Sequence, residues 1–156
     1  MNFIVIMSMV FLILLDQLTK IWAQNVLMSG PDIQVWEGVF HLHYLSNYGA
    51  AWGMLSGKQT FLIIFTSIII IGMIYYMIKL PRTKEGVWTK VALVMIISGA
   101  IGNLIDRVTL GYVRDFLYFI LIDFPIFNVA DILVVVGVGV LMIAMFLGDS
   151  EGSNEV

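Results

Sequence analysis

Long apolar stretches dominate the pattern of hydrophobic and polar positions along the chain. A membrane-spanning helix needs about 20 predominantly apolar residues. Four windows of that length occur, at about residues 2–23, 60–80, 87–107 and 128–147. We therefore predict four transmembrane helices, with longer loops at 24–59 and 108–127.

The first of these loops is not a plain linker. Apolar and polar residues alternate in it so that Phe40, Leu42 and Tyr44 share one face of a strand, and residues 33–36 are placed to pair with that strand in a hairpin. In the second loop, residues 116–122 are aromatic and aliphatic but too few to span a membrane as a helix. The two loops together predict a small β-platform resting on the membrane surface.

Composition supports a membrane protein. Of the 156 residues, 60% are hydrophobic and 12% are charged, and the mean hydropathy of +0.98 lies far outside the range of soluble domains. We expect a single polytopic membrane domain at 1–147, followed by a disordered cytoplasmic tail at 148–156. The sequence has no cysteine, which excludes disulfides, thiolate metal sites and a cysteine nucleophile. No Lys or Arg precedes the first apolar window, so we interpret it as an uncleaved spanning helix.

Basic residues are concentrated between the second and third windows. Four of the eight Lys and Arg residues lie there, at 79–90. The positive-inside rule places this connection in the cytoplasm, so both termini are expected there and the two longer loops outside. The polar clusters near the membrane then fall at the outer face, whereas a transport pathway more often has its ionisable groups near the midplane.

Two carboxylates, Asp115 and Asp131, with a third at Asp123, stand in a mainly aromatic and aliphatic run near the expected outer boundary. A charge is costly there, so we interpret them as a catalytic pair that shares one proton. Simpler alternatives remain open for both. Asn128 and Asp131 also match a helix cap with an acid at its third position, and Asp115 could be a solvated loop acid paired with Arg114.

The third window carries polar residues at helical spacing. Gly99, Asn103 and Asp106 follow i, i+4 and i+7, so they share a face, and Gly102 lies beside it. Helix packing through small residues explains the glycines. We expect a mixed role for the others: Arg107 either binds a substrate carbonyl or phosphate-like group, or neutralises Asp106.

Other polar residues are given structural or no roles. Asp16 and Lys20 lie at i, i+4 in the first window, so we predict an internal ion pair that holds this helix in the bundle. His41 and His43 project from one strand face, but with no acid beside them in sequence we expect no metal there. No serine lies in a nucleophile elbow, so a serine hydrolase is not expected.

Two rival classes remain at this point. One is a small transporter or proton-coupled exporter that uses Asp16 or Asp131 as its ion site, and the other is a structural membrane subunit without chemistry. A transporter's activity would follow a gradient, whereas an enzyme with a catalytic pair of acids would act without one.

Five short motifs occur in an order that spans nearly the whole chain. They are DQLTK at 16–20, NYGAAWG at 47–53, GAIGNLIDR at 99–107, VRDF at 113–116 and FNVAD at 127–131. In these motifs the chain closely resembles the bacterial lipoprotein signal peptidases, or type II signal peptidases. Each motif is weak alone, and the five together are highly specific.

The resemblance implies an all-α membrane protein with four transmembrane helices, a small extracellular β-cradle and a short outer interfacial helix within 50–57. It implies an aspartyl endopeptidase of the bacterial cytoplasmic membrane, with its active site near the outer face. Such an enzyme removes the signal peptide of a prolipoprotein by cleaving before a diacylglyceryl-modified cysteine. By motif, the catalytic residues would be Asp115 and Asp131, and the substrate would be bound by Asn47, Asn103, Arg107 and Asn128.

The implied partners are the lipid-modified prolipoprotein, membrane lipid and inhibitory cyclic-peptide antibiotics. No nucleic acid, metal or organic cofactor is expected, because a water molecule and two acids suffice for the chemistry. We expect a monomer, since four helices around a site need no partner.

Overall fold

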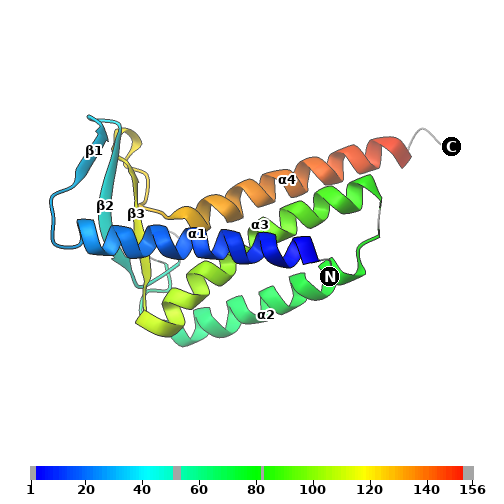
Figure 1. Cartoon of the computed structure of the whole chain (residues 1–156), viewed down its shortest axis with the longest axis horizontal. Coiled ribbons are helices and arrows are strands. Elements are labelled where there is room, and N and C mark those ends of the chain that lie inside the picture. Colours follow the sequence, from blue (N-terminus) through cyan, green and yellow to red (C-terminus); the bar gives the residue numbers. More distant parts are fainter. Residues whose placement is uncertain (1–2, 51–53, 82, 153–156) are drawn as a thin grey trace.

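Four long helices form the body of the protein. The computed structural model describes residues 3–50, 54–81 and 83–152. Its helices are α1 (Phe3–Leu27), α2 (Gln59–Lys79), α3 (Lys84–Leu110) and α4 (Val129–Gly152), and each is long and apolar enough to cross a membrane. Figure 1 shows them running side by side, with a small sheet across one end. The predicted membrane fold is confirmed.

The sheet has three antiparallel strands in the order β1 (Ile33–Trp36), β2 (Phe40–Asn47) and β3 (Val113–Phe119). It lies at the end of the bundle where α1 and α3 finish and α4 begins (Figure 1). Leu45 pairs with Asp115 in the β2–β3 register, which places Asp115 on a strand at the sheet's junction with the helices.

The helices extend beyond the predicted windows at several ends. Thr83 caps α3, because its side chain accepts a hydrogen bond from the Gly86 N–H. Gly111 ends α3 in the left-handed conformation, with φ of 82°. At the other end of the chain, α4 continues through 148–152, a segment expected to belong to a disordered tail. Extending a formed helix adds one backbone hydrogen bond per residue fixed, and 148–152 contains no proline to interrupt it.

The segment expected to hold a short outer helix, 50–57, is described only in part. Residues 51–53 lie outside the described residues, and 54–57 form a turn in which Leu55 and Gly57 have positive φ. The outer region does carry a short 3₁₀ helix elsewhere, η2 (Ile120–Ile122), directly after β3.

The α3 helix is the centre of the bundle. In the most apolar 18-residue window of α3, 44% of the residues are buried, compared with 17–22% in the corresponding windows of the other three helices. The side chains of α1, α2 and α4 therefore remain largely open to the surroundings, as suits helices that face lipid hydrocarbon. The polar residues of α3 are consequently those best placed to meet residues of several other elements.

Gly99 permits the close approach of α3 and α4. A Cβ atom added there would meet the backbone carbonyl oxygen of Ala130 and a methyl group of Val134. We expect Gly99→Ala to lower the free energy of unfolding by about 1–3 kcal/mol, because the backbone of α4 cannot relieve the clash by a change of rotamer, as a side chain could. Gly139→Ala is the matched control, since a Cβ on this α4 residue meets nothing within 4 Å. Equal stability of the two variants in a detergent unfolding titration would contradict this packing.

Candidate active site

Asp115 is enclosed where β3 passes the helix bundle. Its exposed fraction is 2%. The Nδ2 atom of Asn47, from β2, donates to Asp115 Oδ2 over 2.9 Å, and Nδ2 of Asn128 donates to Asp115 Oδ1 over 2.6 Å. The alternative of a solvated loop acid paired with Arg114 is therefore wrong. Successive residues of a strand point to opposite faces, and the Arg114 side chain turns to Asp106 instead.

Asp131 lies in the first turn of α4. Its Oδ1 accepts a hydrogen bond from Asn103 Nδ2 over 2.8 Å, and its Oδ2 accepts one from the Asn128 backbone N–H over 3.1 Å. The Asn128 side chain reciprocates, because its Oδ1 accepts from the Asp131 N–H over 3.1 Å. The helix cap predicted from the Asn128–Asp131 spacing is confirmed, and it fixes the direction of the Asp131 carboxylate.

Asn128 links the two acids. Its Nδ2 atom, which donates to Asp115, also donates to Asn103 Oδ1 over 3.1 Å, and Asn103 in turn donates to Asp131. Each of the four carboxylate oxygens thus accepts an N–H hydrogen bond. Asp115 and Asp131 line the same cavity, of about 1210 Å³.

The two acids interact electrostatically. Burial and the negative charge of Asp131 raise the pKa of Asp115 to about 7. Hydrogen bonds from Asn47 and Asn128 and the charge of Lys20 act in the opposite direction, but they are the smaller effects. Asp115 is therefore able to hold a proton near neutral pH, as a general acid must.

Arg107 lines the same cavity from α3. Its Nη2 atom donates to the backbone carbonyl of Gly49 over 3.1 Å, and its buried Nε has no hydrogen-bond partner among the described residues. Both Asp106 oxygens are bound by Arg114. Of the two roles considered for Arg107, pairing with Asp106 is therefore filled by Arg114, and Arg107 itself lines the cavity.

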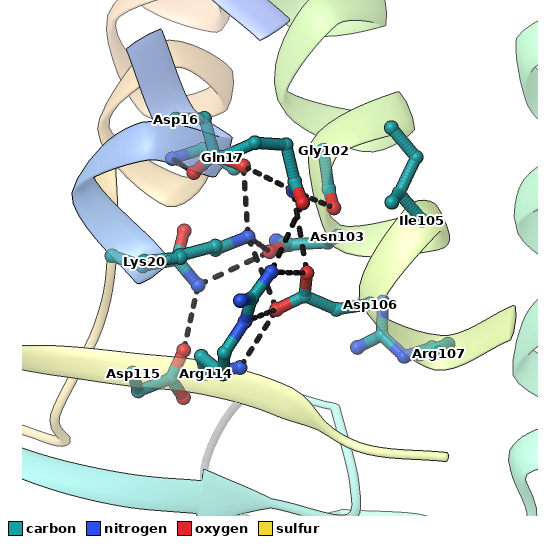
Figure 2. A network of polar contacts seen from close by, with 12 residues as sticks. Asp16, Gln17, Lys20, Gly102, Asn103, Ile105, Asp106, Arg107, Arg114 and Asp115 are labelled. Atoms are coloured by element: carbon teal, nitrogen blue, oxygen red, sulfur yellow. Dashed lines mark hydrogen bonds and ion pairs between the residues drawn. The ribbon is translucent and has the colours of Figure 1, made fainter. Parts of the chain in front are cut away.

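A buried ionic cluster lies beside Asp115 and Asn103 of the site (Figure 2). The predicted ion pair forms, with Lys20 Nζ 2.9 Å from Asp16 Oδ2. Lys20 Nζ also lies 3.8 Å from Asp106 Oδ2, and Arg114 Nη2 lies 2.6 Å from Asp106 Oδ1. Asp16, Lys20 and Asp106 are completely buried. The cluster joins α1, α3 and β3.

Sequence reasoning missed two members of this cluster. Gln17 Nε2 donates to Asp16, to the Gly102 carbonyl and to Asp106, while Gln17 Oε1 accepts from Arg114. A signal for Gln17 was its amide beside Asp16 in an apolar window. For Arg114 the signal was strand alternation, which prevents it from facing its neighbour Asp115.

The histidines of β2 lie apart from this cluster. His43 Nδ1 is 2.7 Å from Asp32 Oδ1 in an exposed pair, and His41 is buried. An acid distant in sequence therefore does reach one of the two rings. Among the residues that the structure describes, no three His, Asp or Glu side chains are grouped so as to hold a metal ion.

Comparison with known proteins identifies the family of this chain. Residues 8–147 match the family model described as signal peptidase (SPase) II. The lipoprotein signal peptidase of Clostridium novyi (strain NT) is 43% identical over 145 residues, which cover 91% of this chain and 95% of the relative. That of Streptococcus pyogenes serotype M1 is 38% identical over 148 residues, covering 95% and 96%.

Solved structures agree with the sequence comparison. A bacterial membrane enzyme structure superposes with a TM-score of 0.85 at 38% identity, covering 94% of this chain and 90% of that chain. A second has a TM-score of 0.79 at 38% identity, covering 90% and 91%. The chain is therefore a multi-pass membrane peptidase. It belongs to the signal peptidase II family, so the transporter and structural-subunit alternatives are set aside.

Proposed function

We propose that the protein is an aspartyl endopeptidase that removes the signal peptide from diacylglyceryl-modified prolipoproteins by cleaving before the lipidated cysteine. One observation carries this proposal. Asp115 and Asp131 line one cavity, accept N–H donors on all four oxygens, and share Asn128 as a partner. Membership of a family whose relatives are named lipoprotein signal peptidases supports the substrate class.

In this mechanism the pair holds a single proton, on Asp115. Asp131, ionised, takes a proton from water as the water oxygen bonds to the scissile carbonyl carbon. Asp115 donates its proton toward the carbonyl oxygen, stabilising the tetrahedral intermediate. When the carbon–nitrogen bond breaks, Asp131 gives the proton that it took from water to the leaving amine, which is the α-amino group of the lipidated cysteine. The proton on the former carbonyl oxygen returns to Asp115, so both acids recover their starting states. The raised pKa of Asp115 supports this assignment.

The cavity offers different surfaces to different parts of the substrate. Beyond the acids it continues along apolar side chains at 134–136 of α4, suitable for a signal helix or an acyl chain. Arg107 lines the cavity, and its guanidinium would donate to a backbone carbonyl of the substrate. Asn47, Asn103 and Asn128 already donate to the acids, so in this proposal they orient the acids in place of holding the substrate.

The cavity also suggests how inhibitors bind. We propose that cyclic-peptide antibiotics bind in it and compete with the substrate, because its mixed apolar and acidic walls suit a lipophilic peptide. We also propose that the protein acts as a monomer, because the residues that line the cavity come from one copy of the chain. We propose that neither a metal nor an organic cofactor takes part.

The test is cleavage in mild detergent without any membrane gradient. Purified protein is incubated with a lipid-modified prolipoprotein in the presence of a metal chelator, and the products are analysed by mass spectrometry. We expect a product that begins at the lipidated cysteine. The same prolipoprotein without its diacylglyceryl group is the matched control. Absence of cleavage, or cleavage at another bond, would refute the proposal.

We propose that the sheet lies at the outer membrane face and both termini in the cytoplasm. The start of α1, the end of α4 and the adjoining ends of α2 and α3 all lie at the end of the bundle opposite the sheet (Figure 1). Because the chain lacks cysteine, single variants can be labelled without background. In intact cells, we expect an impermeant maleimide to label Glu37→Cys, in the β1–β2 turn, and to spare Pro81→Cys. Labelling of Pro81→Cys and not of Glu37→Cys would show that the topology is the opposite of the one proposed.

The activity should depend on pH through Asp115. Its pKa of about 7 means that its proton is retained below that pH and lost above it, so the rate should fall as pH rises through about 7. The hydrogen bond from Asn47 stabilises the ionised form and lowers this pKa. In Asn47→Leu the pKa therefore rises, and the descending limb of the pH–rate profile should move to higher pH.

The control for this prediction is Asn25→Leu, the same change at an exposed α1 position. Its profile should coincide with that of the unmodified enzyme. A descending limb at unchanged pH in Asn47→Leu would show that Asp115 is not the group that loses the proton.

A further inference from the structure

We propose that Lys20 is a positioning residue for both acids, because its ammonium group fixes the orientation of the Asn103 amide on which the Asp131–Asn128–Asp115 arrangement depends. The inference rests on the proposed function, since it assigns the acids their catalytic role. It gives the buried ionic cluster a task beyond holding α1 in the bundle. Figure 2 shows Lys20 reaching from α1 toward Asn103 of α3.

The Lys20 ammonium has three donors and no acceptor, and the structure supplies acceptors around it. Its Nζ donates to Asn103 Oδ1 over 2.8 Å and lies 2.9 Å from Asp16 Oδ2 and 3.8 Å from Asp106 Oδ2. The side chain is completely buried, so water does not compete for these donors. The amide oxygen of Asn103 is thereby drawn to Lys20, which leaves its amide nitrogen to face Asp131.

Only one orientation of the Asn103 amide satisfies its neighbours. Oδ1 also accepts from Asn128 Nδ2 over 3.1 Å, and Nδ2 donates to Asp131 Oδ1 over 2.8 Å. If the amide were flipped, its NH₂ group would face two other donors, from Lys20 and Asn128, and its oxygen would face the Asp131 carboxylate. Lys20 therefore sets the direction of the whole hydrogen-bond chain.

The partner of Lys20 also contacts α4 directly. Asp16 Oδ1 accepts the N–H of Ala130, the residue before Asp131, over 2.9 Å. Gly102 leaves room for this carboxylate, because a Cβ there would collide with Asp16 Oδ2. The Asp16–Lys20 pair thus holds both α3 and the start of α4. A buried ion pair is often no more stabilising than an apolar pair of similar volume, so its presence at this point is better explained by orientation than by stability.

The charges around Lys20 and Asp115 predict that removing Lys20 also changes the pKa of Asp115. Lys20 faces Asp16 and Asp106, and Arg114 already pairs with Asp106. Asp115 faces Asp131, and Lys20 and Arg107 act on it as positive charges. Removing the Lys20 charge takes away a stabiliser of the ionised Asp115, so the pKa of Asp115 should rise.

The test is Lys20→Met, which keeps the length of the side chain and removes its donors and charge. With purified full-length protein, we expect kcat to fall roughly 100-fold, as misplaced reacting groups typically cost, with KM little changed because Lys20 does not touch substrate. The descending limb of the pH–rate profile should move to higher pH. Lys90→Met is the control, because this half-buried α3 cation donates to the Leu80 carbonyl over 3.4 Å, away from the site.

A second variant distinguishes a loss of activity caused by misfolding from one caused by the loss of positioning. Asp16→Asn combined with Lys20→Met leaves no unpaired charge of this pair buried, and the asparagine oxygen can still accept the Ala130 N–H. The same fall in kcat is expected, with a smaller shift of the profile to higher pH because the negative charge of Asp16 is removed as well. Wild-type kcat in either folded variant, or a loss that only follows the folded fraction at an unchanged pH profile, would overturn the inference.

The same assay separates this inference from the proposed function. Asp115→Asn and Asp131→Asn are measured beside the Lys20 variants. If these two variants are inactive and Lys20→Met behaves as wild type, only the positioning role of Lys20 fails. If either of them cleaves at the wild-type rate, the proposed function itself fails.

Discussion

Replacing Asp131 by asparagine should abolish peptide cleavage, with a loss in kcat of roughly 10⁴-fold, the upper range for a positioned general base. An amide cannot take a proton from the attacking water. The oxygen of asparagine can still accept the cap hydrogen bond from the Asn128 N–H, so the start of α4 should stay formed. Asp115→Asn should have a similar effect, because an amide has no acidic proton to donate to the carbonyl oxygen.

Two measurements distinguish loss of chemistry from loss of fold. Thermal unfolding in detergent should show that both variants are folded at the assay temperature, with a modest loss of stability because an NH₂ group replaces an oxygen that accepts an N–H hydrogen bond. Glu37→Gln is the matched control, since it neutralises an exposed acid in the β1–β2 turn and should leave kcat unchanged. Cleavage at a near wild-type rate by either aspartate variant would remove that residue from the mechanism.

The parts of the fold that the sequence predicted correctly are those encoded within one segment. The four helices follow from uninterrupted apolar windows, the Asn128–Asp131 cap from a three-residue spacing, and the Asp16–Lys20 pair from an i, i+4 spacing. Each of these depends on neighbours within about one helical turn, where the geometry of a helix is already fixed.

The parts it could not predict depend on how separate helices face one another. Gln17 contacts Gly102 and Asp106, 85 and 89 residues further along the chain. Helices that face lipid are apolar on nearly every side, so hydropathy does not indicate which side of α1 meets α3. Only the polar residues carry that information, and which of them pair is decided by the folded arrangement. The reversal at Gly111, which brings Arg114 back onto Asp106, is one such case.

Removing Arg114 should be among the most destabilising single changes in the protein. In Arg114→Leu, Asp106 loses side-chain donors at 2.6 Å and 3.1 Å, and Gln17 loses one at 3.0 Å. Asp106 is completely buried, and its remaining cation, Lys20, lies 3.8 Å away. We therefore expect the free energy of unfolding to fall by about 3–5 kcal/mol, as when one partner of a buried ion pair is removed.

The double variant Asp106→Asn with Arg114→Leu tests the cause of this loss. If the cost arises from an uncompensated buried carboxylate, neutralising that carboxylate should recover part of the stability, so the two changes should not be additive. Unfolding titrations in detergent measure all three variants. Additive losses would mean that Arg114 stabilises β3 through packing alone. Lys20 also contacts Asp106. If the double variant recovers stability but not activity, the charges of this cluster are needed for catalysis at Asp115 and Asp131 as well as for the fold.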